Sequence, residues 1–204
     1  MRRIEFKPEV SYTESYTGYF ELPDMKSGAY YSVYQAPGYI SNYQRINVLK
    51  ASSAMFQSTD PVPMIPVLDE HQLALSLTWG NRLYDLDLSV EFVASPDITC
   101  RVNFANRECG GVRLIVDNSM ESARSSADII QFDFIDKETN YLVYVNLNTL
   151  RTKTAAKNHS FNLSQGLLKV FSPYYDWPVL QLHAPQVDGN NHDSNWIAFC
   201  LIGD

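Results

Sequence analysis

Hydrophobic and polar residues alternate most regularly between Leu73 and Phe92. Residues 73–79 read L-A-L-S-L-T-W, and residues 86–92 read L-D-L-S-V-E-F, with a turn between them. A period of two residues is the pattern of a β-strand with one buried face. We therefore predict two neighbouring strands of one sheet, with the polar residues of the second strand on the side away from the core.

Similar short stretches recur along the chain, whereas helical periodicity is scarce. In the first third the predicted strands are residues 4–6, 18–22, 30–35 and 45–49. Later ones are residues 72–79, 87–93, 99–104, 112–117, 129–135, 141–146, 167–171, 179–183 and 196–202. Short helical turns are expected at residues 52–56 and 119–124 only.

A proline-rich stretch, residues 60–66, separates the two sets of strands and suits a linker, because proline cannot donate to a ladder. The pattern predicts an all-β fold in two parts. Residues 68–204 form an antiparallel β-sandwich of nine strands. Residues 1–67 form a smaller β-domain that leans on it, since so short a domain buries little surface alone.

Composition and charge narrow the class of protein. The 204 residues are 45% hydrophobic and 19% charged, and the 13 Tyr, 10 Phe and 3 Trp favour sheet. A net charge of −7 argues against nucleic acid or anionic lipid as the main partner. The sequence has neither the apolar core of a signal peptide nor a run of about 18 apolar residues. We expect a cytoplasmic protein without membrane insertion, or an extracellular one if the sequence is a piece of a longer secreted protein.

Three cysteines cannot all pair within one chain. Cys100 and Cys109 lie across a predicted hairpin, so a disulfide between them is conceivable and would leave Cys200 over. Without a secretion signal we expect reduced, buried thiols.

Short motifs resemble those of two known kinds of β-domain. Residues 28–39 read G-A-Y-Y-S-V-Y-Q-A-P-G-Y, which resembles the strand and turn of carboxypeptidase-regulatory-like (transthyretin-like) domains. Four further motifs are similar to those of an uncharacterised β-sandwich family: T-W-G at 78–80, D-L-D at 85–87, L-I-V-D at 114–117 and W-I-A-F at 196–199. The resemblance implies a small transthyretin-like or Ig-like domain before a non-catalytic, extracellular or scaffold-associated β-module.

The chain departs from the second family at several points. Leu83 or Tyr84 replaces a proline, Ser89 stands where a histidine is common, and A-D-I at 127–129 takes the place of Pro-Glu-Thr. The resemblance supplies no reaction.

Four carboxylates are the candidate ligands for a metal ion: Asp85, Asp87, Asp117 and Asp128. The first two share one strand face, with Cα atoms about 6.6 Å apart. The other two lie at the end and the start of predicted strands, so the four can converge at one end of the sandwich. Oxygen ligands of this kind suit Ca²⁺. The alternative is that Asp85 and Asp117 accept backbone N–H groups in turns.

Three aromatic residues in a predicted loop, Tyr174, Tyr175 and Trp177, are candidates for contact with a glycan or a protein partner. The alternative is a loop that folds back to cap the core.

The sequence therefore predicts a non-enzymatic interaction or scaffold module with a protein partner and a possible Ca²⁺ site. A carbohydrate-binding module that uses the aromatic loop is one alternative. The other alternative is a hydrolase. The sequence shows no nucleophile elbow, phosphate loop or zinc-ligand spacing, so the catalytic site of such a hydrolase would be assembled only by the fold.

Overall fold

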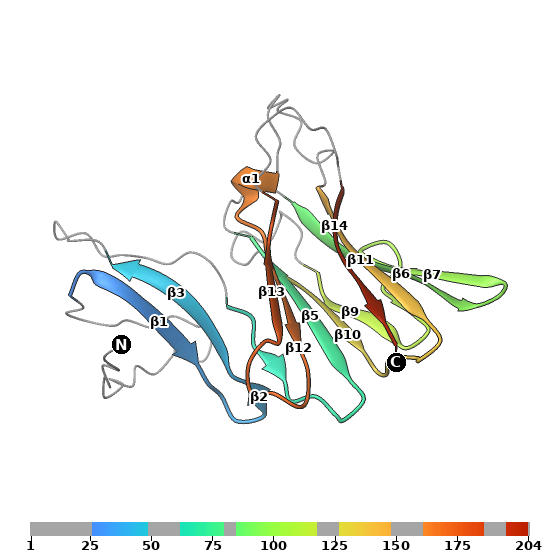
Figure 1. The fold of residues 1–204 in the computed structure, drawn as a ribbon, viewed down its shortest axis with the longest axis horizontal. Coiled ribbons are helices and arrows are strands. Elements are labelled where there is room, and N and C mark those ends of the chain that lie inside the picture. Colours follow the sequence, from blue (N-terminus) through green and yellow to red (C-terminus); the bar gives the residue numbers. More distant parts are fainter. Residues whose placement is uncertain are drawn as a thin grey trace. The chain divides into compact units, whose positions relative to one another are not determined.

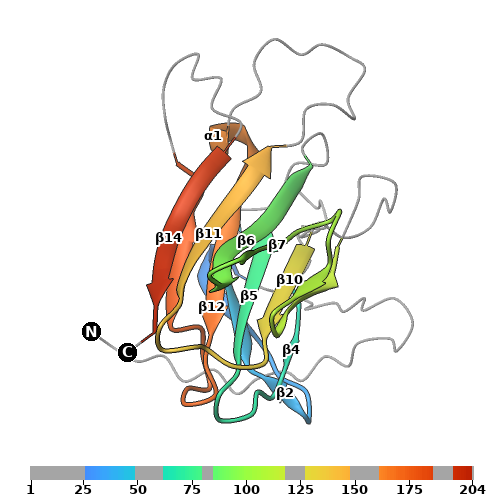
Figure 2. The ribbon, with the colours of Figure 1, turned by 90° about the vertical axis from the view of Figure 1, so that its right-hand side faces the viewer.

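Two large antiparallel sheets form a β-sandwich, which confirms the predicted all-β fold. The computed structural model describes residues 26–48, 62–79, 85–117, 127–147, 161–185 and 195–203. The first sheet has the order β13 (Leu180–His183), β12 (Leu167–Phe171), β5 (Leu73–Thr78), β10 (Ala127–Phe132), β9 (Val112–Val116) and β8 (Glu108–Cys109). The second has the order β14 (Asn195–Ile202), β11 (Asn140–Leu147), β6 (Leu86–Ser95) and β7 (Ile98–Val102). Figure 2 shows the second sheet in front of β12, β5 and β10.

The remaining described elements are two small two-stranded sheets and one helical turn (Figure 1). They are β1 (Gly28–Tyr34) with β3 (Asn42–Val48), β2 (Tyr39–Ile40) with β4 (Ile65–Pro66), and the one-turn helix α1 (Phe161–Ser164). No helix among the described residues is long and apolar enough to cross a membrane.

Two compact units make up the chain: Met1–Ser32 with Arg45–Phe56, and Val33–Gln44 with Gln57–Asp204. Compactness does not establish which stretch folds alone, so the domain boundary predicted near residue 67 stays a prediction. Every site discussed below lies in the second unit.

The main hydrophobic core lies between the two large sheets. Leu75 and Leu77 of β5 and Leu88 and Val90 of β6 are all buried in it, two positions apart on each strand as the alternation predicts. The nine strands predicted after residue 70 are all present, with bounds that differ by up to a few residues. The two-residue strand β8 was not predicted.

The prediction of one buried face is wrong for β5, because both of its faces are buried. A second hydrophobic cluster covers the face opposite Leu75. Its members are Ile40, Ile65, Leu68, Ala74, Ile129 and Phe171. The proline-rich stretch is also not a linker throughout. Its last two residues, Ile65 and Pro66, form β4, and Ile65 pairs with Ile40 and helps to cover the sheet. Pro66 is tolerated because β4 is short and has a ladder partner on one side only.

The strands predicted at residues 4–6 and 18–22 and the turns predicted at residues 52–56 and 119–124 lie outside the described residues.

Candidate metal site

Three of the four predicted acidic residues come together where the two large sheets meet. Asp87 lies in β6, Asp128 in β10, and Asp117 directly follows β9. One carboxylate oxygen from each lies within 4.8 Å of the others. Asp87 and Asp128 are buried and Asp117 is half-buried.

Strand register brings Asp117 and Asp128 to facing positions. Ile129 pairs with Val116 in the antiparallel β9–β10 ladder. Asp128 precedes Ile129 and Asp117 follows Val116, so the two aspartates face each other. Facing residues on adjacent strands have Cβ atoms about 4.5–5.5 Å apart, and like charges at that distance destabilise a sheet.

The free edge of β6 explains how Asp87 reaches this pair. The β6–β7 ladder runs only from Val90 to Ser95, so the first part of β6 lies beyond it. There the backbone N–H of Leu88 donates a hydrogen bond to Oδ2 of Asp128 at 3.0 Å. This bond joins β6 to β10 and holds Asp87 beside the other sheet.

The structure does not place Asp85 with these three. It directly precedes β6 and is buried, and its carboxylate is not one of the group within 4.8 Å. The polar residues of β6 were predicted to lie on the side away from the core. Two of them, Asp87 and Ser89, are instead buried.

The chemistry of the triad is that of a hard cation site. All three donors are carboxylate oxygens, which Ca²⁺ prefers at about 2.3–2.6 Å, so ligands on opposite sides of the ion lie about 4.6–5.2 Å apart. The chosen carboxylate oxygens of Asp87, Asp117 and Asp128 lie no more than 4.8 Å from one another, so all three can bind the same ion.

A buried lysine is a polar feature that the sequence interpretation missed. Lys169 of β12 is 6% exposed, and its Nζ donates to Oδ1 of Asn42 at 2.7 Å and to the backbone oxygen of Tyr43 at 2.8 Å. Burial lowers the pKa of Lys169 to about 8. Its position among the apolar residues of L-L-K-V-F, at 167–171, is the one sequence signal that points to it.

The predicted aromatic loop lies between β12 and β13, and its rings are exposed. Tyr174 is 67% and Trp177 is 42% exposed, and Tyr175 is also exposed. Trp177 packs edge-on against Tyr43 with 5.5 Å between ring centroids, and the Tyr174 hydroxyl donates to the backbone oxygen of Glu70 at 2.9 Å. The loop is therefore held in place while much of its aromatic surface meets solvent.

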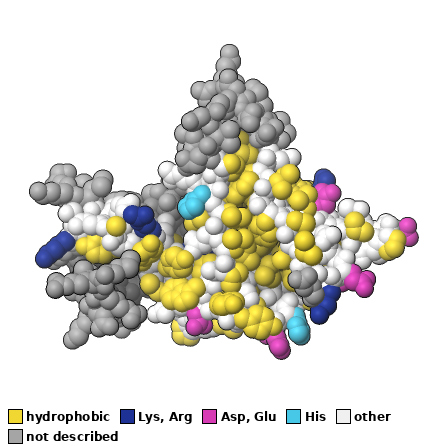
Figure 3. Space-filling view, viewed as in Figure 1, with side chains coloured by type: hydrophobic (Ala, Val, Ile, Leu, Met, Phe, Trp, Pro, Cys, Tyr) yellow, Lys and Arg dark blue, Asp and Glu magenta, His cyan; other side chains and the backbone are white. Residues whose placement is uncertain are grey.

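Apolar side chains are also exposed on the two edge strands β13 and β14. They include Leu180, Ile197 and Ile202. Figure 3 shows hydrophobic side chains gathered over the region where Figure 1 places these strands. Exposed apolar surface of this kind is typical of protein contact.

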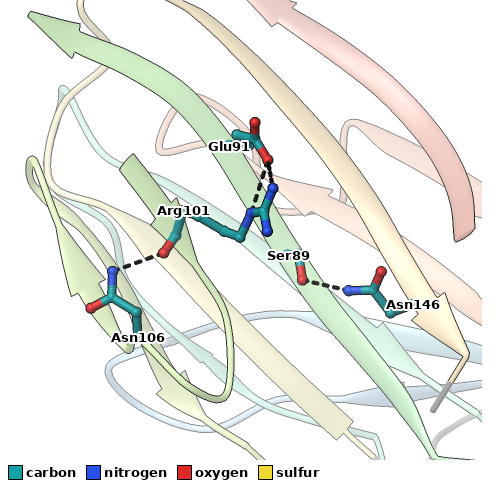
Figure 4. A network of polar contacts seen from close by, with 5 residues as sticks. All are labelled: Ser89, Glu91, Arg101, Asn106 and Asn146. Carbon is teal, nitrogen blue, oxygen red and sulfur yellow. Dashed lines mark hydrogen bonds and ion pairs between the residues drawn. The ribbon is translucent and has the colours of Figure 1, made fainter. Parts of the chain in front are cut away.

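The four-stranded sheet carries a separate polar network, drawn in Figure 4. Arg101 forms an ion pair with Glu91 at 2.7 Å, and Asn146 donates to Ser89 Oγ at 2.9 Å. The hydrogen bond to Glu91 raises the pKa of Arg101, which keeps it charged, and burial raises the pKa of Tyr144 nearby. Exposed ion pairs contribute little to stability, so we assign this network a local role.

Cys100 and Cys109 form a disulfide, so the expectation of reduced thiols is wrong for this pair. The bond links β7 to β8 and thereby one large sheet to the other. Cys200 is free and exposed.

No family model matches this chain. No curated protein and no solved structure matches it either. The resemblance to transthyretin-like domains and to the second β-sandwich family therefore stays a prediction.

Proposed function

We propose that this chain is a non-enzymatic β-sandwich module that binds Ca²⁺ through Asp87, Asp117 and Asp128 and acts by contact with a partner protein. The observation that carries the proposal is the convergence of three carboxylates from three strands within 4.8 Å. Two of them are buried, where like charges interact more strongly than in water.

The ligand set favours calcium over other ions. Mg²⁺ requires near-ideal octahedral geometry and gives up its water ligands reluctantly, whereas Ca²⁺ accepts a flexible arrangement of carboxylate oxygens. Zinc and copper prefer nitrogen or sulfur ligands, and the triad offers neither. Calcium accepts six to eight oxygen ligands, and backbone oxygens and water would have to supply those beyond the three carboxylates.

An ion at this position would have a structural effect as well. Asp87 belongs to one large sheet, and Asp117 and Asp128 belong to the other. A shared cation would bridge the sheets and remove the repulsion among the three carboxylates. We therefore expect calcium to stabilise the folded sandwich.

The disulfide supports the extracellular alternative for localisation over the cytoplasmic one. Bonds such as Cys100–Cys109 persist in oxidising compartments and are rare in the cytosol. Extracellular modules bind calcium with dissociation constants of about 0.1–1 mM, which a site with three carboxylates can provide.

Thermal melting of the full chain in EDTA and in 10 mM CaCl₂ tests the proposal. A dissociation constant of about 0.1–1 mM predicts a gain of about 1.4–2.7 kcal/mol, because the ion binds the folded state only. For a chain of this size the midpoint should rise by about 3–10 °C.

Two variants define the result. Asp117→Asn removes one ligand charge at the most exposed of the three positions and should abolish most of the shift. Asp97→Asn changes an exposed aspartate in the turn between β6 and β7 and should leave it intact. The proposal fails if calcium does not move the midpoint of the unaltered chain, or if both variants keep the full shift.

The exposed rings of Tyr174, Tyr175 and Trp177 favour a second candidate function, contact with a carbohydrate. Aromatic faces stack on sugar rings, and this loop offers three of them. Glycan-array binding that is lost in Trp177→Ala would support it. A silent array, together with a protein partner whose capture depends on Trp177, would assign the loop to protein contact instead.

A further inference from the structure

Lys169 and Asn42 meet in a buried site that the calcium proposal does not use. The two residues are 127 positions apart, and the Lys169 Nζ lies 2.7 Å from the carboxamide oxygen of Asn42. Asn42 is 1% exposed and Lys169 is 6% exposed. An amine and a carboxamide are therefore held in contact and away from water.

The amine has no acidic partner among the described residues. Its contacts are all with neutral groups: the Asn42 carboxamide oxygen, the Tyr43 backbone oxygen and the Tyr43 ring, whose centroid is 5.4 Å away. A buried ammonium without a counter-ion is costly, so the neutral amine is favoured. The pKa of Lys169, lowered to about 8 by burial, agrees with this. A neutral amine is also the nucleophilic form of lysine.

The surroundings of Asn42 suit attack on its side-chain carbonyl. The Tyr43 backbone N–H donates to Asn42 Oδ1 at 2.8 Å, so it can stabilise negative charge that develops on that oxygen. The Asn42 amide nitrogen donates to the Pro63 backbone oxygen at 2.9 Å, which fixes the orientation of the carboxamide.

A hydroxyl group lies next to the amine. Ser76 pairs with Lys169 across the β5–β12 ladder, so the two side chains lie on the same face of the sheet. Ser76 is buried, and its Oγ has no hydrogen-bond partner. This hydroxyl can pass a proton from the attacking nitrogen to the departing one.

From this arrangement we propose that Lys169 and Asn42 join in an intramolecular isopeptide bond. Nζ attacks Cγ of Asn42, the Cγ–Nδ2 bond breaks, and a proton from Nζ leaves with Nδ2 as ammonia. Carbonyl and amine become a secondary amide, and no oxidant, reductant or further reactant is needed. The bond fastens Asn42, the first residue of β3, covalently to β12.

Mass spectrometry of the full chain, with its disulfide reduced, tests the proposal. Loss of ammonia should lower the intact mass by about 17 Da. After trypsin, the peptide of residues 27–45 should be joined to the peptide that begins at residue 158, with no cleavage after Lys169.

Controls separate this bond from other losses of ammonia, such as cyclisation of a different asparagine. Lys169→Met and Asn42→Ala should both restore the full mass. The unaltered chain at full mass after prolonged incubation at pH 9, with Lys169 cleaved by trypsin, overturns the proposal. A loss of about 17 Da that persists in Lys169→Met also overturns it.

Discussion

Asp128 Oδ2 accepts a hydrogen bond from the backbone N–H of Leu88 at 3.0 Å, and this bond crosses from one large sheet to the other. Both groups are buried. Asp128 therefore has a structural role that is separate from any metal ligation, and the two roles can be measured independently.

Asp128→Ala and Asp128→Asn should differ in stability when no metal is present. Alanine leaves the buried Leu88 N–H without its acceptor, which costs about 1–3 kcal/mol, whereas asparagine keeps an oxygen at that place. Urea unfolding in EDTA measures the difference. Asp97→Ala, at an exposed turn, should change stability by less than about 0.5 kcal/mol. Equal stability of the two Asp128 variants would contradict the structural role.

The disulfide should contribute measurably to stability. Replacing both Cys100 and Cys109 with alanine opens a short loop and is expected to lower the free energy of unfolding by about 2–3 kcal/mol. Urea unfolding without reducing agent measures this. The exposed Cys200→Ala serves as the control and should behave like the unaltered chain. An unchanged midpoint in the double variant would rule the contribution out.

Two buried serines should respond differently to alanine. Ser76 Oγ has no hydrogen-bond partner. In the Asn42→Ala chain, where the isopeptide bond cannot form, Ser76→Ala therefore removes only a desolvated group and should be neutral or slightly stabilising. Ser164 Oγ donates to the Phe161 oxygen at 2.6 Å and accepts from Gly166 N–H at 3.1 Å. Ser164→Ala should therefore cost about 1–3 kcal/mol. Thermal melting of both variants tests the contrast, which would be refuted if Ser76→Ala were the more damaging.

Lys169 should produce an unusual pH dependence in the Asn42→Ala chain, where the isopeptide bond cannot form. Burial lowers the pKa of Lys169 from 10.5 to about 8, so between these values the unfolded chain binds a proton that the folded chain does not. Stability is then greatest above pH 10.5 and falls by about 3 kcal/mol as the pH is lowered to about 8.

Tyrosines also titrate in that range, so the useful quantity is the difference from an Asn42→Ala/Lys169→Met chain. Urea unfolding at several pH values between 7 and 10.5 supplies it. The unaltered chain, with its lysine in an amide, should lack this dependence. A difference that does not change with pH would show that Lys169 is not titrating as expected.

The acidic site was predictable in part. Asp117 and Asp128 stand at strand ends in the sequence, and antiparallel pairing of neighbouring strands makes their approach a local consequence of register. Asp85 was assigned to the site because it shares the alternation with Asp87. Asp85 precedes the first residue of β6, and its carboxylate is not among the three that come within 4.8 Å of one another.

The sequence by itself determined the nine longer strands after residue 70 and which of their residues form the main core, because apolar residues at every second position of a strand share one face. Tertiary structure alone decided what covers the second face of β5 and that Lys169 lies against Asn42. These contacts depend on how distant segments pack on a sheet, and local periodicity carries no information about that packing.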